Sequence, residues 1–161
     1  MNRCDALPAN LEAEVSDTLR TLLKNKGRTV HTVAPEATVL EAVRKMNQAR
    51  IGALLVMSGD DLVGIFTERD VLTRVVDQTR DPAATRVAEV MTSKPVVVTA
   101  AATVNEAMAV VSEKRCRHLP VVDEGRLIGL VSAGDLTHWV TRGHEYHIQD
   151  LVNYITGKYP G

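Results

Sequence analysis

The sequence contains few aromatic residues and few cysteines, and both shortages limit what the protein can be. Phe, Trp and Tyr together make up 3% of the 161 residues, so a core must be built mainly from Val, Leu, Ala, Ile and Met. Cys4 and Cys116 are the only cysteines, and they form no CxxC pair. This count excludes a disulfide framework and favours a reducing, cytosolic environment.

Long apolar runs and a strong net charge are also missing. No apolar run reaches the roughly 18 residues of a membrane-spanning helix, and segment 1–15 lacks the apolar region of a secretory signal. The formal net charge is −1, which removes the main electrostatic argument for binding nucleic acid or a membrane surface. We therefore expect a soluble cytoplasmic protein with neither of these partners.

Motifs of common enzyme classes are absent as well. The chain has neither the GxGxxG of dinucleotide-binding folds nor the GxxxxGK[ST] of a P-loop. His144 and His147 have the spacing of two metal ligands on a helix but lack an evident third, so a solvated helix face is the alternative. Cys116 has basic neighbours but no catalytic Cys–His spacing. We expect no catalysis and no metal site.

The dominant feature that is present is an internal repeat. Residues 33–70 align without a gap with residues 98–135. Such a repeat in two copies predicts a pseudo-symmetric pair of units rather than a solenoid. Identical pairs include Thr38/Thr103, Glu41/Glu106, Arg50/Arg115, Leu54/Leu119, Gly64/Gly129 and Asp70/Asp135.

Each copy predicts the same order of elements, β-α-β-β-α. The Thr and Glu of each copy form a capping box at the start of an amphipathic helix. Apolar, β-branched runs bounded by polar turns predict two strands after this helix, and a second helix follows directly. The expected segments are extended pieces at 30–33 and 96–98, first strands at 51–57 and 117–122, and second strands at 62–66 and 127–131.

The fold class is therefore α/β (α+β), with two units and flanking helices. Apolar stripes predict an N-terminal helix within residues 10–26 and a C-terminal helix around 148–155. Both helices either cover exposed core or, at the C-terminus, meet a second subunit. The expected division is an N-terminal helix in 1–27, units at 28–80 and 87–140, and a C-terminal helix and tail in 141–161.

The end of each second strand is a candidate ligand site, because a helix N-terminus there favours an anion. In the first copy, the Thr67 hydroxyl and the Asp70 carboxylate suit the hydroxyl donors of a ribose, and Arg69 could pair with phosphate. Ser132 and Asp135 repeat this pattern in the second copy. Thr-x-x-Asp and Ser-x-x-Asp are also ordinary helix caps, and that alternative stays open.

The start of the first strand differs between the copies. Segment 115–120 reads Arg-Cys-Arg-His-Leu-Pro, so basic side chains enter a strand that Pro120 deprives of one N–H, as at the border of a cleft. Arg117 and His118 are candidate phosphate ligands, and a solvated strand start is the alternative. The first copy has Arg50-Ile-Gly-Ala53 here, whose small residues offer a surface for a flat adenine.

These segments together resemble the CBS (cystathionine-β-synthase) domain pair, or Bateman module, over roughly residues 28–140. The motifs that carry the resemblance are Gly64-Ile-Phe-Thr-Glu-Arg-Asp70, Gly129-Leu-Val-Ser-Ala-Gly-Asp135, Arg117-His-Leu-Pro-Val121 and Val90-Met-Thr-Ser-Lys-Pro95. The C-terminal Asn153-Tyr-Ile-Thr-Gly157 is similar to stand-alone proteins of this family. The resemblance implies two units packed pseudo-symmetrically, adenosine ligands in two clefts between them, and a dimer formed through the CBS helices.

The resemblance also implies crossed sites, each drawing on both units. Thr67 and Asp70 would bind ribose together with phosphate ligands Arg69, Arg117 and His118, near Pro120 and the backbone of Val98. Ser132 and Asp135 would act with Arg50, Gly52, Ala53 and the backbone of Val33. Gly134 stands where the family often has a basic residue, so the second site is expected to be the weaker one.

The implied function is a regulatory module that binds AMP, ADP or ATP and catalyses nothing itself. NAD and S-adenosylmethionine present the same adenosine group and are alternative ligands. A different alternative is a protein-interaction module whose clefts bind no nucleotide. In either case, a signal would leave through a homodimer or a regulated protein partner.

Overall fold

The computed structural model describes residues 17–143, and the first half of the repeat forms a four-stranded sheet. The strand order is β1-β2-β3-β4, with β1 parallel to β2 and the other pairs antiparallel. In chain order the elements are β1 (Thr32–Val33), α3 (Val39–Ala49), β2 (Ala53–Ser58), β3 (Asp61–Thr67), α4 (Glu68–Asp70), η1 (Val71–Val76), α5 (Val87–Val90) and β4 (Thr92–Ser93).

The second half repeats this arrangement around a three-stranded sheet of order β5-β6-β7. Its elements are β5 (Val98–Thr99), α6 (Val104–Lys114), β6 (His118–Asp123) and β7 (Arg126–Ser132), followed by a helix over residues 133–143. The β6–β7 pairing has the same register and the same bulge position as β2–β3. The predicted α/β class and the two β-α-β-β-α units are confirmed.

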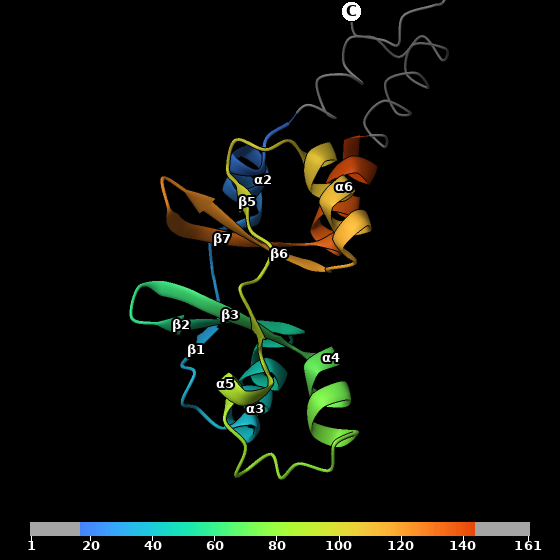
Figure 1. The fold of residues 1–161 in the computed structure, drawn as a ribbon. Coiled ribbons are helices and arrows are strands. Elements are labelled where there is room, and N and C mark those ends of the chain that lie inside the picture. Colours follow the sequence, from blue (N-terminus) through green and yellow to red (C-terminus); the bar gives the residue numbers. More distant parts are fainter. Residues whose placement is uncertain (1–16, 144–161) are drawn as a thin grey trace, which may run out of the picture.

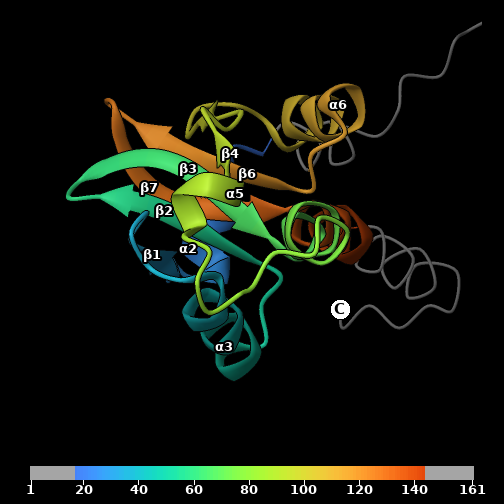
Figure 2. The same ribbon diagram turned by 60° about the horizontal axis from the view of Figure 1, so that its bottom comes forward.

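The two sheets face each other, with the helices on the outer sides (Figure 1). Hairpins β2–β3 and β6–β7 extend to the same side of the molecule (Figure 2). A small apolar cluster of Ala53, Leu55 and Ile65 packs with Leu127 and Leu130 of β7 and joins the sheets. Each half also has its own core beneath its helices. This packing leaves the polar ends of the strands at the seam between the halves.

The capping boxes start both long helices as the sequence predicts. The Thr38 N–H donates to Glu41 Oε2 at 2.8 Å, and the Glu41 N–H donates to Thr38 Oγ1 at 3.2 Å. The corresponding bonds between Thr103 and Glu106 are 2.7 and 3.1 Å long. These bonds lower the pKa of both glutamates, because they favour the charged carboxylate.

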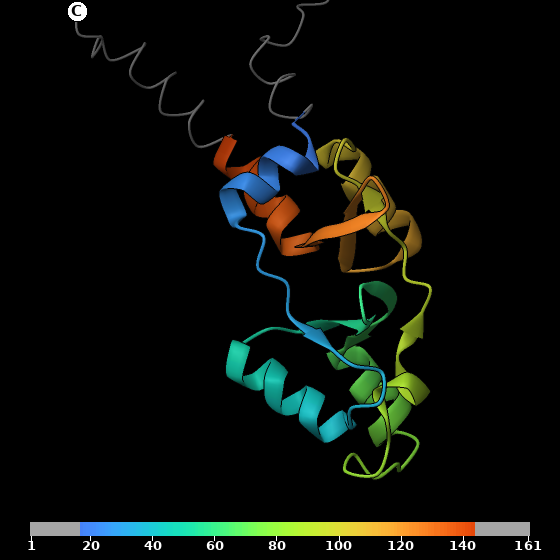
Figure 3. The same ribbon diagram turned by 90° about the vertical axis from the view of Figure 1, so that its left-hand side faces the viewer.

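Each half is covered by a helix that precedes the other half in the chain. Helix α2 (Leu19–Lys26) buries Leu19, Leu22 and Leu23 in the core of the second half, and the chain then crosses to β1 (Figure 3). Helix α5 follows the first half, buries its apolar side chains there, and leads into the second half. Matching β-bridges anchor the two helices, Thr18 to Thr103 and Thr38 to Arg86.

Two glycines that are equivalent in the repeat make room for these covering segments. A Cβ at Gly129 would lie 2.7 Å from a methyl of Leu23 in α2. A Cβ at Gly64 would lie 2.5 Å from the Met91 sulfur and 2.9 Å from the Thr92 carbonyl oxygen. The contacts make Leu23 and Met91 structural counterparts. Beyond them the two segments differ, because α2 continues as a helix to Lys26 whereas α5 ends at Val90 and β4 begins at Thr92.

Some details differ from the sequence-based expectation. The second helix of the first half becomes a π-helix after one turn, with Asp77 N–H donating to Leu72 O at 3.0 Å. Strand β6 begins at His118, one residue later than expected. Cys4, the helix predicted around 148–155, and the pair His144 and His147 lie outside the described residues. Within 17–143, no helix is long and apolar enough to cross a membrane.

Candidate functional site

Two clefts open along the seam between the halves, and each is lined by both of them. The first cleft has a volume of about 370 Å³ and contains Thr67 and Asp70 from one half with Arg117 and His118 from the other. The second has a volume of about 500 Å³ and contains Ser132 from one half with Arg50 and Gly52 from the other. These residues thus lie in the crossed arrangement that the resemblance implies.

At the first cleft, Thr67 and Asp70 form a capping box at the start of α4. Asp70 Oδ2 accepts the Thr67 N–H at 2.9 Å and the Thr67 hydroxyl at 2.8 Å. Thr67 and Asp70 therefore do cap a helix, as the alternative interpretation of the sequence had it, and the same two residues also line the cleft. Asp70 is only 6% exposed, and a buried carboxylate with spare acceptor capacity favours a donor from a ligand.

Arg74 joins Asp70 to the segment that covers the first half. Its Nη1 lies 3.5 Å from Asp70 Oδ1 and donates to the carbonyl oxygens of Val90 at 3.0 Å and Met91 at 2.6 Å. The guanidinium thus binds the C-terminal carbonyls of α5, where a cation is favourable. Sequence reasoning missed Arg74, although its position four residues after Asp70 on a helix was a signal.

The walls of the first cleft are rich in cations. Arg69, Arg117 and His118 lie there as expected, and four further basic residues accompany them, Arg74, Lys94, Lys114 and Arg115. The only acidic side chains in the same lining are Glu68 and Asp70. On a chain with a net charge of −1, this is a local excess of positive charge, which attracts an anionic ligand.

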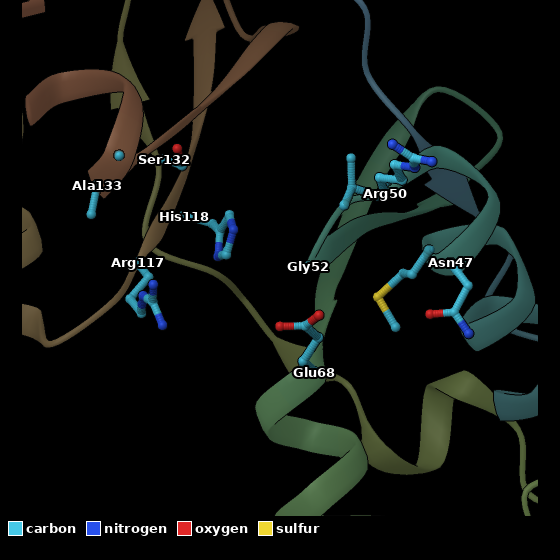
Figure 4. Close-up of a pocket in the computed structure, with 11 residues that line it drawn as sticks. Asn47, Arg50, Gly52, Glu68, Arg117, His118, Ser132 and Ala133 are labelled. Atoms are coloured by element: carbon cyan, nitrogen blue, oxygen red, sulfur yellow. The ribbon is translucent and has the colours of Figure 1, made fainter. Parts of the chain in front are cut away.

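His118 lines both clefts, and Figure 4 shows it in the second. Burial lowers the pKa of its imidazole, and the neighbouring Arg117 guanidinium lowers it further. The ring is therefore neutral at pH 7, with one nitrogen that donates and one that accepts. A phosphate dianion beside it would favour the protonated form.

Pro120 has no backbone N–H, and this affects the backbone that borders the first cleft. Its counterpart in the first half, Leu55, donates its N–H to the His31 carbonyl at 3.1 Å. Pro120 is buried in β6 opposite Leu130 and cannot donate the equivalent bond to Val96. Val96 and Pro95 line the cleft, so this stretch of backbone borders the ligand space.

Four predicted base-binding residues do not line either cleft. Ala53 and Pro120 are buried in the sheets, Val98 belongs to the core of the second half, and Val33 packs against the core of the first. Their side chains fill the interior because alternate strand residues face it. Backbone contacts at these positions stay a prediction, and Val96 is the cleft-lining residue next to β5.

At the second cleft, Asp135 is bonded within the protein. Its Oδ2 accepts the Ser132 N–H at 2.7 Å and the Ser132 hydroxyl at 2.8 Å, and Lys26 Nζ donates to the same oxygen. Although burial acts to raise the pKa of this carboxyl, the bonds from Lys26 and Ser132 outweigh it and hold the pKa below its usual value. Asp135 is not among the residues that line the second cleft.

The remaining walls of the second cleft come from both halves (Figure 4). Arg50 ends α3 in a left-handed conformation with a φ of 54°, and its repeat partner Arg115 ends α6 with a φ of 51°. A Cβ at Gly52 would lie 3.1 Å from the Glu68 carboxylate, so a larger residue there would have to displace that side chain. Gly134 lines the second cleft at the position that Arg69 occupies in the first, so the second cleft lacks this guanidinium.

Metal binding finds no support in the described part of the chain. Residues 17–143 contain no group of three or more His, Cys, Asp or Glu side chains arranged to hold an ion. Cys116 is half-buried at the first cleft, and burial raises the pKa of its thiol. A raised pKa keeps the thiol protonated and unreactive at pH 7.

Comparison with known proteins identifies the family of the chain. The family model for the CBS domain matches residues 27–77 and 87–142. The chain is 35% identical over 163 residues to a mitochondrial CBS domain-containing protein of Arabidopsis thaliana, covering 94% of this chain and 79% of that protein.

Solved structures show the same fold. A protein with CBS domains from Burkholderia ambifaria is 48% identical, with a TM-score of 0.73 over 75% of this chain and 91% of the other. A CBS domain protein from Pyrobaculum aerophilum, solved in complex with AMP, is 25% identical, with a TM-score of 0.67 over 74% and 89%. The chain belongs to the CBS domain family and carries two CBS domains in tandem.

Proposed function

We propose that this protein is a regulatory module that binds an adenosine nucleotide in the first cleft and catalyses nothing itself. The observation that carries the proposal is the meeting of Thr67 and Asp70 from one half with Arg117 and His118 from the other. A single ligand there would contact both halves. Nucleotide binding can therefore alter how the halves are held together.

The chemistry of each wall matches one part of a nucleotide. Asp70 is an acceptor for the ribose hydroxyls, and the basic side chains around Arg117 provide charge for phosphates. The Val96 backbone next to Pro120 offers a carbonyl to the amino group of adenine. AMP, ADP and ATP fit this set, and NAD presents the same adenosine. S-adenosylmethionine fits it less well, because its sulfonium is a cation among cations.

Support from relatives is limited to the class of ligand. The Pyrobaculum aerophilum protein was solved with AMP, and its fold is the same. We extend adenosine binding to this chain because the first cleft has room and the required donors and acceptors. The regulatory role follows from the coupling between halves, which typically amounts to about 1–3 kcal/mol.

The signal leaves through a second copy of the chain or a regulated partner. On η1, Leu72 is 63% exposed and Val76 is 61% exposed, and both lie on one side of this helix. Apolar side chains of this kind support the homodimer expected through the CBS helices. A cytoplasmic location, inferred from the sequence, belongs to the same proposal.

Thermal unfolding with AMP, ADP, ATP, NAD and S-adenosylmethionine tests the proposal. A nucleotide at 100 times its dissociation constant should stabilise the fold by about 2.7 kcal/mol. Asp70→Ala should abolish most of this shift, while circular dichroism shows an intact fold. An unchanged affinity in Asp70→Ala would refute the ribose assignment. No shift with any of the five ligands would favour a protein-interaction module with empty clefts.

A further inference from the structure

Lys26, the last residue of α2, contacts Asp135, the repeat counterpart of Asp70. Its Nζ donates to the Leu130 carbonyl at 2.9 Å and to the Asp135 carboxylate. Helix α2 precedes both repeat units and is fixed on the second half by Leu19, Leu22 and Leu23. The lysine is therefore delivered by a segment outside the repeat.

The first cleft shows the arrangement without this contact. In the described residues no lysine pairs with the Asp70 carboxylate, and Lys94, which follows β4, lines the first cleft. Asp70 faces Arg74 at 3.5 Å, and that guanidinium is already held by the Val90 and Met91 carbonyls. Asp70 lines its cleft, and Asp135 does not line the second. The two carboxylates thus differ in what covers them.

We infer that Lys26 is an internal substitute for a nucleotide ribose and keeps the second cleft from binding a nucleotide. This inference rests on the proposed function, since it assigns the same role to Asp135 as to Asp70. The ammonium donates to the carboxylate, as a ribose hydroxyl would. Asp135 Oδ2 accepts two bonds from Ser132 just as Asp70 Oδ2 does from Thr67, so the bond from Lys26 is what distinguishes the two carboxylates.

The contact between Lys26 and Asp135 is only partly buried. The side chains of Lys26 and Asp135 are 37% and 25% exposed. Ion pairs at such exposure contribute little to stability, so removal of the lysine should open the site without unfolding the protein. Lys26→Met keeps the aliphatic length of the side chain and removes only the ammonium.

Calorimetric titration with AMP tests the inference through stoichiometry. The wild type should bind one AMP per chain, and Lys26→Met should bind two. Asp70→Ala should bind none, and Asp70→Ala combined with Lys26→Met should bind one, now at the second cleft. Lys24→Met is the matched control, because Lys24 is an exposed lysine of the same helix turn, and should leave the stoichiometry at one.

The outcomes separate this inference from the proposed function. Two AMP molecules on the wild type, or no binding to the double variant, would overturn the role of Lys26. No binding to the wild type combined with one AMP on the double variant would refute the first cleft as a site but uphold the role of Lys26. Melting temperatures of all variants show whether the fold is kept, and Lys26→Gln provides a second test if Lys26→Met is unstable.

Discussion

His118 should make the stability of the protein depend on pH, because burial and the neighbouring Arg117 lower the pKa of its ring. The folded protein binds the imidazole proton more weakly than the unfolded chain does. Stability from this group is therefore complete above the usual pKa of 6.5 and decreases as pH falls from 6.5 towards the lowered folded value. Melting temperatures between pH 5 and 7.5 should show this slope, and His118→Gln should flatten it.

Nucleotide binding should reverse the effect on His118. A phosphate group beside the ring favours the protonated form, so binding near pH 6.5 should take up protons. Titrations in buffers of different ionisation enthalpy measure that uptake. Equal apparent enthalpies in all buffers would show that His118 is remote from the phosphate.

Arg117 should discriminate between ligands by their phosphates. Because a charge-assisted hydrogen bond contributes about 1.5–3 kcal/mol, Arg117→Ala should weaken ATP binding by roughly tenfold or more and leave adenosine binding nearly unchanged. Arg126→Ala is the control, since Arg126 is exposed at the start of β7 and lines neither cleft. Equal losses for both ligands would remove Arg117 from the phosphate site.

At the scale of elements, the two glycines under the covering segments should differ in tolerance. Gly129→Ala meets only the end of the Leu23 side chain, which can rotate. Gly64→Ala also meets the Thr92 carbonyl oxygen, which is backbone and paired into the sheet through β4. We expect Gly64→Ala to cost about 1–3 kcal/mol and Gly129→Ala less, as measured by urea unfolding. The opposite order would contradict the packing of α5.

Much of the element pattern could be predicted from the sequence, because it depends on local signals. Capping boxes, apolar periodicity and the repeat predict the order β-α-β-β-α within each half. The π-helical turn of η1 was not predictable, since α- and π-helices differ in which backbone groups pair and not in the side-chain pattern. Strands β1 and β5 are each only two residues long, and where they begin and end depends on backbone pairing with the neighbouring strand, which the side-chain pattern does not show.

The candidate site was predictable only in part. Two pairs of site residues are close in sequence, Thr67 with Asp70 and Arg117 with His118. To predict that they share one cleft, it was enough to know that the two halves pack against each other. Lys26 and Arg74 were missed, because their contacts depend on where α2 and α5 dock. Backbone contacts of Val33 and Val98 with the ligand stay a prediction, and the side chains of both residues belong to the two cores.

At the scale of the whole molecule, the exposed side of η1 predicts self-association. Leu72→Asp places a charge within the proposed dimer contact and should shift the protein towards a monomer, because burying an unpaired charge is costly. Size-exclusion chromatography with light scattering measures the mass. Asp60→Lys is the control, because it changes charge at the exposed turn between β2 and β3 and lies outside η1.

The exchange of α2 and α5 between the halves has a consequence for how the chain folds. A cut in the loop between Val76 and Val87 would leave an N-terminal fragment without α5 and a C-terminal fragment without α2. Each fragment would expose the apolar surface that its missing helix covers, so neither should be stable alone, and mixing them should restore the native spectrum. The intact chain should melt in a single calorimetric transition, as one cooperative unit built from two interlocked copies.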